Sequence, residues 1–305
     1  MQQATNQIPT WDEIQRRLEQ IYELPAMPDM AQRLLMLRND PNASAADLGR
    51  LVELDPSLAA QVVHYATSPF FGYRGKVESI RDAVSRVLGF DMVVNMALGL
   101  ATSRSFRNPP DGPLGLNAFW RHSVYTAVLV QSLAAGMPRD SRPKPGMAYL
   151  AGLLHNFGFL LLGHLFPPEF QLLNKLVAAN PDTPVMELEK RVLGMGQAQD
   201  CLGMGHAQVG AWLMAHWGMP GEITVSLREH HNPEYDGEHA VYARLVQVAD
   251  HLLKRYGIGD APHGDLPESV MARLGLSEAE AMEVTTKLLE SAPSLDAMAR
   301  QLSSH

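Results

Sequence analysis

The chain has 305 residues, enough for one large domain or two modest ones, and 46% of them are hydrophobic, as in an ordinary globular core. Its formal charge is −8 and no Lys/Arg-rich run stands out, which argues against a surface that follows nucleic-acid phosphates. The single cysteine, Cys201, excludes a disulfide framework within the chain and fits a reducing compartment.

The beginning of the chain lacks a basic segment followed by an apolar one, so we expect no signal peptide. The longest apolar stretch looks too short for a membrane span and is interrupted by polar residues. We therefore expect a cytoplasmic protein that neither inserts into a membrane nor binds nucleic acid.

Nearly every segment has helical periodicity, and no run alternates in the way of a half-buried strand, so the sequence predicts an all-α fold. A capping box at residues 10–13 begins a helix that ends near Tyr22, and a proline-rich linker follows at 24–28. The next helices are predicted over residues 30–37, 44–54, 57–66, 79–88 and 91–105.

The clearest break in the chain is the segment 108–115 (NPPDGPLG), whose proline and glycine density indicates a linker between two subdomains. Loops are expected at 136–146, 194–205 and 257–267. The second block of helices is predicted over residues 117–135, 148–163 with a break at Gly158, 168–179, 184–193, 206–217, 222–231, 239–256, 277–290 and 294–302.

The stretch 148–163 (AYLAGLLHNFGFLLLG) is nearly all apolar, yet His155 and Asn156 stand side by side at its centre. An imidazole and an amide in such surroundings need polar partners, because burying them unpaired costs several kcal/mol. Two residues elsewhere have similar settings, since His122 lies on a mostly apolar helix face and Asp250 interrupts an apolar stripe. The remaining candidates for the same pocket are His206, His230 and His231.

Neutral imidazoles with a carboxylate make a suitable ligand set for zinc, iron or manganese. Two such ions about 3.5–4 Å apart could hold a phosphate and activate water, but that arrangement favours a bridging carboxylate. Asn156 brings no negative charge, so we expect two ions to bind weakly and no cofactor beyond one divalent ion. The alternative, that each histidine is only a hydrogen-bonded core residue, stays open. No catalytic residue is assigned.

Several motifs occur in order along the chain: 24–28 (LPAMP), 54–58 (LDPSL), 66–68 (ATS), 80–89, 119–123 (FWRHS), 151–158 (AGLLHNFG) and 206–220 (HAQVGAWLMAHWGMP). In this order they resemble the HDOD domain, a bacterial signalling relative of the HD-type metal phosphohydrolases. The resemblance covers about residues 24–223 and extends more loosely to Asp250. It departs at two positions, because Asn156 replaces the aspartate of the His-Asp pair and Phe159 replaces a lysine that is often found there.

The resemblance implies an N-terminal helical subdomain (24–107) packed on an HD-like helical bundle (116–223). Residues 1–23 would form a separate N-terminal helix, and 224–305 an extension that completes the bundle. Two overlapping residue sets follow for the pocket. The ligand pocket would contain His122, His155, Asn156 and His206, and the metal positions would be His122, His155, Asp250, His230 and His231.

The function implied is a non-catalytic signal-transduction module with a degenerate HD pocket. Its expected partners are signalling proteins in trans, for example a sensor kinase, a receiver or a cyclic-di-GMP protein, or a second copy of the chain. The alternative is a metal-dependent phosphohydrolase that acts on a nucleotide or a cyclic dinucleotide.

Overall fold

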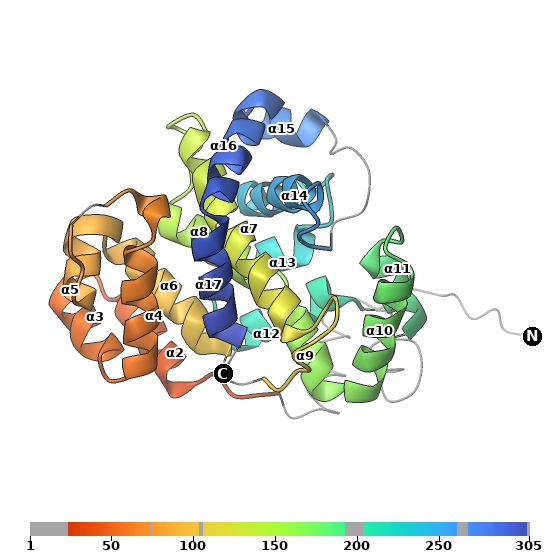
Figure 1. Ribbon diagram of the computed structural model, residues 1–305, viewed down its shortest axis with the longest axis horizontal. Coiled ribbons are helices and arrows are strands. Elements are labelled where there is room, and N and C mark those ends of the chain that lie inside the picture. Colours follow the sequence, from red (N-terminus) through yellow and green to blue (C-terminus); the bar gives the residue numbers. More distant parts are fainter. Residues whose placement is uncertain (1–23, 74, 104–105, 193–203, 261–267, 304–305) are drawn as a thin grey trace, which may run out of the picture.

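The computed structural model describes residues 24–73, 75–103, 106–192, 204–260 and 268–303. Over these residues the regular secondary structure is helical throughout, which confirms the predicted all-α class (Figure 1). The predicted helix at 10–22 and Cys201 lie outside the described residues.

The N-terminal half follows the predicted order of helices. Its elements are α2 (Asp29–Asn39), α3 (Ala45–Val52), α4 (Pro56–Ala66), η1 (Pro69–Phe71), α5 (Ile80–Asp82), η2 (Ala83–Leu88) and α6 (Phe90–Thr102). The Ser44 side chain and Asp47 form a capping box at the start of α3, and Asp55 caps α4 in front of Pro56. The predicted helix 79–88 is one α-helical turn followed by the π-helical turn η2.

The second half forms the larger bundle. Its elements are α7 (Leu116–Gly136), α8 (Pro145–Leu154), α9 (Phe157–Leu165), α10 (Pro167–Ala179), α11 (Val185–Val192), α12 (His206–His216), α13 (Gly221–Glu229), α14 (Ala240–Lys254), α15 (Glu268–Leu274), α16 (Glu278–Glu290) and α17 (Ala292–Ser303). The sequence analysis did not predict α15. This helix is short, and just two of its residues, Val270 and Leu274, are buried.

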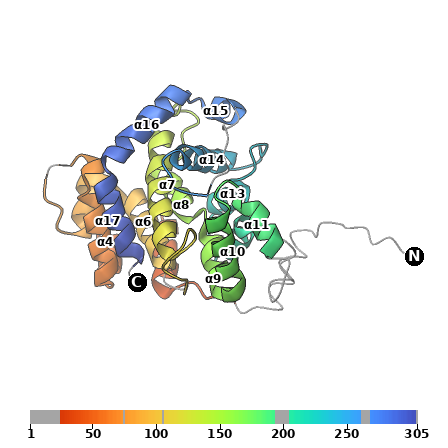
Figure 2. The same ribbon diagram turned by 45° about the vertical axis from the view of Figure 1, so that its right-hand side comes forward.

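The two halves share one hydrophobic core. In its centre α7 packs along α8, and α6 from the N-terminal half packs against the same α8. The last helix, α17, returns to lie against α7 and against α4 of the first half (Figure 2). The predicted architecture, an N-terminal helical subdomain on a helical bundle, is therefore confirmed.

The predicted break at Gly158 is wrong: α8 ends at Leu154 and α9 begins at Phe157, so the break falls at His155 and Asn156. Gly158 lies inside α9, where a Cβ atom would come within 1.8 Å of the His206 carbonyl oxygen. This glycine therefore allows α9 to approach α12 closely and does not interrupt the helix. The break places both polar residues of the apolar stretch outside regular helix.

The apolar stretch recognised at 148–163 lies within a longer apolar segment, Pro145–Leu165, which includes α8 and α9. By length and composition alone this segment could cross a membrane, but it is entirely buried inside the structure. An apolar stretch covered on all sides by other helices is an ordinary feature of a globular core. The cytoplasmic location stays a prediction.

Candidate metal centre

Three segments bring their polar residues together in the middle of the bundle. His122 comes from α7, His155 and Asn156 from the break between α8 and α9, and Asp250 from α14. The His122 Nε2 atom donates to Asp250 Oδ1 at 3.0 Å, and His155 Nε2 lies 3.6 Å from the same oxygen. Thr126 Oγ1 also donates to this oxygen, at 3.4 Å. The buried carboxylate on the α14 stripe thus has the histidine partners that its burial requires.

A second set of histidines lies beside the first. His206 begins α12, while His230 and His231 follow directly after α13. The His206 Nε2 atom lies 3.1 Å from His231 Nε2 and 3.4 Å from His230 Nε2. The rings of His155 and His230 meet edge to face, with centroids 5.2 Å apart, so the two sets are contiguous.

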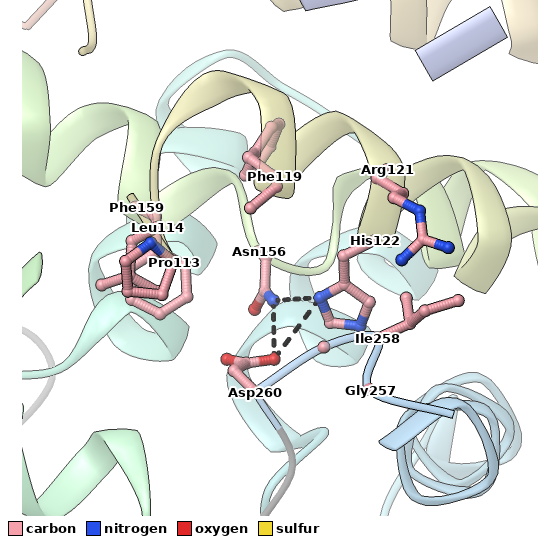
Figure 3. A pocket seen from close by; sticks show the side chains of 12 residues that line it. Pro113, Leu114, Phe119, Arg121, His122, Asn156, Phe159, Gly257, Ile258 and Asp260 are labelled. Atoms are coloured by element: carbon pink, nitrogen blue, oxygen red, sulfur yellow. Dashed lines mark hydrogen bonds and ion pairs between the residues drawn. The ribbon is translucent and has the colours of Figure 1, made fainter. Parts of the chain in front are cut away.

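Asp260 also points into this pocket, and the sequence analysis missed it because it placed residues 257–267 in an ordinary loop. Its Oδ1 atom accepts a hydrogen bond from Asn156 Nδ2 at 3.1 Å and lies 3.5 Å from His122 Nδ1 (Figure 3). Its Oδ2 atom faces His206 Nε2 at 3.9 Å. The signal available in the sequence was an aspartate directly after Gly257-Ile258-Gly259, at the end of a helix that already carries Asp250.

The ligand atoms therefore form two groups, each with its atoms within 4.8 Å of one another. The first donor group is His122, His155, Asp250 and Asp260, and the second donor group is His206, His230 and His231. All six of the histidine and aspartate candidates from the sequence are included, and Asn156 contacts His122 and Asp260 of the first donor group.

Glu189 is another residue that the sequence analysis missed. One of its oxygens, Oε1, accepts hydrogen bonds from both the backbone N and the Nδ1 of His206, each at 2.9 Å. Glu189 is 1% exposed and lies among the buried residues Leu188 and Val192 on α11. A glutamate within an apolar helical stripe was the sequence signal for this contact.

Three of the histidines are oriented by hydrogen bonds that their Nδ1 atoms donate. His155 donates from Nδ1 to the Gly152 carbonyl oxygen at 2.7 Å, and His230 donates from Nδ1 to the Leu227 carbonyl oxygen at 2.7 Å. His206 uses its Nδ1 in the same way toward Glu189. Metal-binding histidines typically donate their other ring N–H to a carbonyl or carboxylate, which fixes the tautomer and leaves Nε2 free to bind.

Neighbouring carboxylates raise the pKa of two of the histidines. Burial lowers the pKa of His122, but the hydrogen bond and charge of Asp250, with the charge of Asp260, outweigh it and raise that pKa above its ordinary value. Burial likewise opposes protonation of His206, and Glu189 more than compensates, so its pKa is raised. Burial raises the pKa of Asp260, and the surrounding histidines overcome that effect and lower it.

The other three histidines are kept neutral. Burial lowers the pKa of His155, with His122 adding to the effect. Burial and the neighbouring imidazoles place the pKa of His230 well below its usual range and lower that of His231 to about 4. A neutral imidazole is the form that binds a metal ion.

Several polar atoms in the pocket have no hydrogen-bond partner although they are buried. They are His155 Nε2, Asn156 Oδ1, Asp250 Oδ2 and Asp260 Oδ2. Leaving such atoms unpaired is costly, and a cation bound among them would satisfy the nitrogen and the carboxylate oxygens at once. The chemistry of these donors, imidazole with carboxylate, fits zinc, iron or manganese.

Beside the pocket lies a cavity of about 230 Å³ that reaches His122, Asn156 and Asp260 (Figure 3). Its other walls are mainly apolar, including Leu114 and Phe159. The Phe159 ring stacks on the His206 imidazole, with centroids 4.0 Å apart and an angle of 14° between the planes.

Comparisons with known proteins agree with this architecture. The model of the HDOD domain family matches residues 24–233. A crystal structure named "Putative signal transduction protein", from Marinobacter aquaeolei VT8, is 39% identical with a TM-score of 0.82, and the match covers 97% of this chain and 67% of that one. An HDOD domain protein of unknown function from Geobacter sulfurreducens is 24% identical with a TM-score of 0.71, over 95% of this chain and 97% of that one.

Two further relatives are more distant. A "Putative phosphohydrolase" from Shewanella amazonensis SB2B is 22% identical with a TM-score of 0.71, over 94% of this chain and 97% of that one, which is a likeness of fold alone. An uncharacterized protein of Treponema pallidum (strain Nichols) is 23% identical over 276 residues, which are 90% of this chain and 50% of that protein. The chain therefore spans about half the length of this curated relative.

Proposed function

Because the chain belongs to the HDOD family, we propose that it is a non-catalytic module of bacterial signal transduction. In this role the pocket binds a ligand or a divalent ion without turning over a phosphoester. Its partners are signalling proteins that bind in trans in the cytoplasm, such as a sensor kinase, a receiver or a cyclic-di-GMP protein.

The observation that carries this proposal is the shortage of free positive charge around the cavity. Phosphoryl transfer depends on cations that stabilise the charge of the phosphoryl oxygens. Among the described residues that line the cavity, Arg121 is the one lysine or arginine, and it is engaged by Asp296 at 2.9 Å. Lys254 lines the neighbouring cavity, where its Nζ atom donates to the Gly259 carbonyl oxygen. Phe159 presents an aromatic ring to the pocket, where it stacks on His206.

The size of the cavity supports the same proposal. Pockets that enclose a small-molecule ligand usually measure about 300–1,000 Å³. The cavity beside His122 measures about 230 Å³, and the neighbouring one, which also touches Asp260, about 210 Å³. Each alone is small for a nucleotide and smaller still for a cyclic dinucleotide.

The second candidate function is a metal-dependent phosphohydrolase that acts on a nucleotide or a cyclic dinucleotide. The observation in its favour is the pair of contiguous donor groups. A divalent ion bound there would polarise a phosphoryl oxygen or lower the pKa of a water molecule.

A turnover assay separates the two functions. The purified protein, with its metal content measured, is incubated with Mn²⁺ or Fe²⁺ and with cyclic dinucleotides or nucleoside phosphates. We expect product formation no faster than with the metal ions alone, because free cations to hold the phosphate are lacking. Turnover that disappears in His155→Ala would contradict the proposal and establish the phosphohydrolase.

A further inference from the structure

Asn156 contacts His122 and Asp260 of the first donor group and contributes no negative charge to it. We propose that Asp260 supplies the carboxylate that Asn156 lacks, and that the pocket therefore binds one divalent transition-metal ion in the first donor group. This inference does not depend on the proposed function, because an ion can be bound with or without turnover.

A tight turn after α14 places Asp260 in the pocket. Gly257 has φ +70° and Gly259 has φ +97°, which are conformations that other residues rarely adopt. Between them, the Ile258 side chain is 3% exposed, and its backbone N donates to the Leu253 carbonyl oxygen at 3.1 Å. The turn is therefore anchored to the end of α14 and has a defined path.

Gly259 lies directly against His122. A Cβ atom on this glycine would come within 2.7 Å of His122 Nε2, so the absence of a side chain lets the backbone pass over the imidazole. Lys254 reinforces the turn, because its Nζ atom donates to the Gly259 carbonyl oxygen at 3.5 Å. The next residue along the chain, Asp260, then enters the pocket with its side chain 9% exposed.

One carboxylate oxygen of Asp260 is fixed by a hydrogen bond, and the other has no hydrogen-bond partner. Its Oδ1 atom accepts from Asn156 Nδ2 at 3.1 Å, so the amide orients the new carboxylate. Its Oδ2 atom is buried without a hydrogen-bond partner. His155 Nε2 and Asp250 Oδ2 are also buried and unpaired, and all three residues belong to the first donor group.

The charges decide how many ions bind tightly. Asp250 and Asp260 together carry a formal charge of −2, which balances one divalent ion. The second donor group consists of imidazoles alone, and the nearby Glu189 is already paired with His206. An ion in the second donor group would therefore have less compensating charge, so we expect one tight ion for each chain.

The experiment measures metal binding without any substrate. The full chain is freed of metal by chelation and titrated with Mn²⁺, and free Mn²⁺ is followed by its electron paramagnetic resonance signal. We expect one tight ion for each chain and a rise in Tm on binding. The variant Asp260→Asn should lose at least about tenfold in affinity, since even outer-shell partners of metal ligands are worth about 10–100-fold.

A double variant tests whether charge replacement is the reason. Asn156→Asp combined with Asp260→Asn moves the acid from one residue to the other, and it should restore tight binding of one ion. The control Asp236→Asn removes an exposed carboxylate that pairs with Arg244 and belongs to neither donor group, and it should leave affinity unchanged. Circular dichroism of each metal-free variant verifies that it is folded.

Three results would overturn the inference. One is a wild-type chain that binds no Mn²⁺ in the pocket. Another is an Asp260→Asn variant that is folded and binds as tightly as the wild type, or more tightly, which would mean that Asp260 only neutralises the histidines. The third is a folded double variant that does not regain binding. None of these results bears on turnover, so the proposed function is tested separately.

Discussion

At the residue scale, the amide of Asn156 changes which residue provides a carboxylate to the pocket. Asn156 Nδ2 reaches both His122 Nδ1, at 3.3 Å, and Asp260 Oδ1, at 3.1 Å. The carboxylate that an aspartate would have provided is thus replaced by an amide that orients another carboxylate. Glu189 has a comparable relation to His206, since it fixes the ring through Nδ1 and also binds the backbone.

Replacing Glu189 tests how much the pocket depends on this buried pair. Glu189→Ala leaves the backbone N and Nδ1 of His206 without a partner, and breaking a buried pair in this way costs about 3–5 kcal/mol. We expect the free energy of unfolding, measured by urea denaturation, to fall by about that amount. Glu187→Ala on the same helix removes an exposed carboxylate and should change it by no more than about 0.5 kcal/mol. Equal losses in the two variants would contradict the assigned role of Glu189.

At the element scale, the interrupted helix α8–α9 is the framework of the pocket. The interruption turns His155 and Asn156 into the bundle, and α12 packs closely on α9 so that His206 lies opposite them. This approach needs two glycines, because Gly158 meets the His206 carbonyl oxygen and Gly210 of α12 meets the backbone of Gly158. His206 of the second donor group is therefore positioned by a contact between helix backbones.

The same substitution at two helical glycines should have opposite effects. Gly158→Ala places a Cβ atom against the His206 carbonyl oxygen, so α9 and α12 must separate, and overpacking of this kind costs about 1–3 kcal/mol. Gly49→Ala on α3 has no neighbour closer than 4.0 Å and should stabilise the protein by about 0.5–1 kcal/mol, because glycine weakens a helix. Thermal unfolding of both variants measures the difference. A stable Gly158→Ala variant would show that the two helices can separate at little cost.

At the scale of the whole molecule, α17 joins the N-terminal half to the bundle (Figures 1 and 2). Its buried residues Leu295 and Met298 pack into the common core, and the helix contacts both α4 and α7. The Asp296 side chain accepts from Tyr125 at 2.9 Å and from Arg121 at 2.9 Å, which also holds the cation at the cavity. Stability of the N-terminal half and of the bundle should therefore be coupled through this helix.

Leu295→Ala tests that coupling. Removing a fully buried leucine side chain costs about 2–5 kcal/mol, and the loss should be felt on both sides of α17. We expect hydrogen exchange, read by mass spectrometry, to accelerate together in peptides from α4 and α7. Leu54→Ala, at a leucine that is 65% exposed, should leave exchange unchanged. Faster exchange confined to α17 itself would mean that the helix is a peripheral addition.

The sequence by itself determined the helical class, most helix positions and the six histidine and aspartate candidates of the pocket. Helical periodicity and polar interruptions of apolar stripes are local patterns, so they can be recognised without knowing the fold. The position of the break at His155 and Asn156 was decided by tertiary structure, because Gly158 serves the approach of α9 to α12 and not the end of a helix. Tertiary structure also decided that Asp260 and Glu189 belong to the pocket. Each lies far along the chain from the histidine that it meets, and only packing brings a buried charge to its partner.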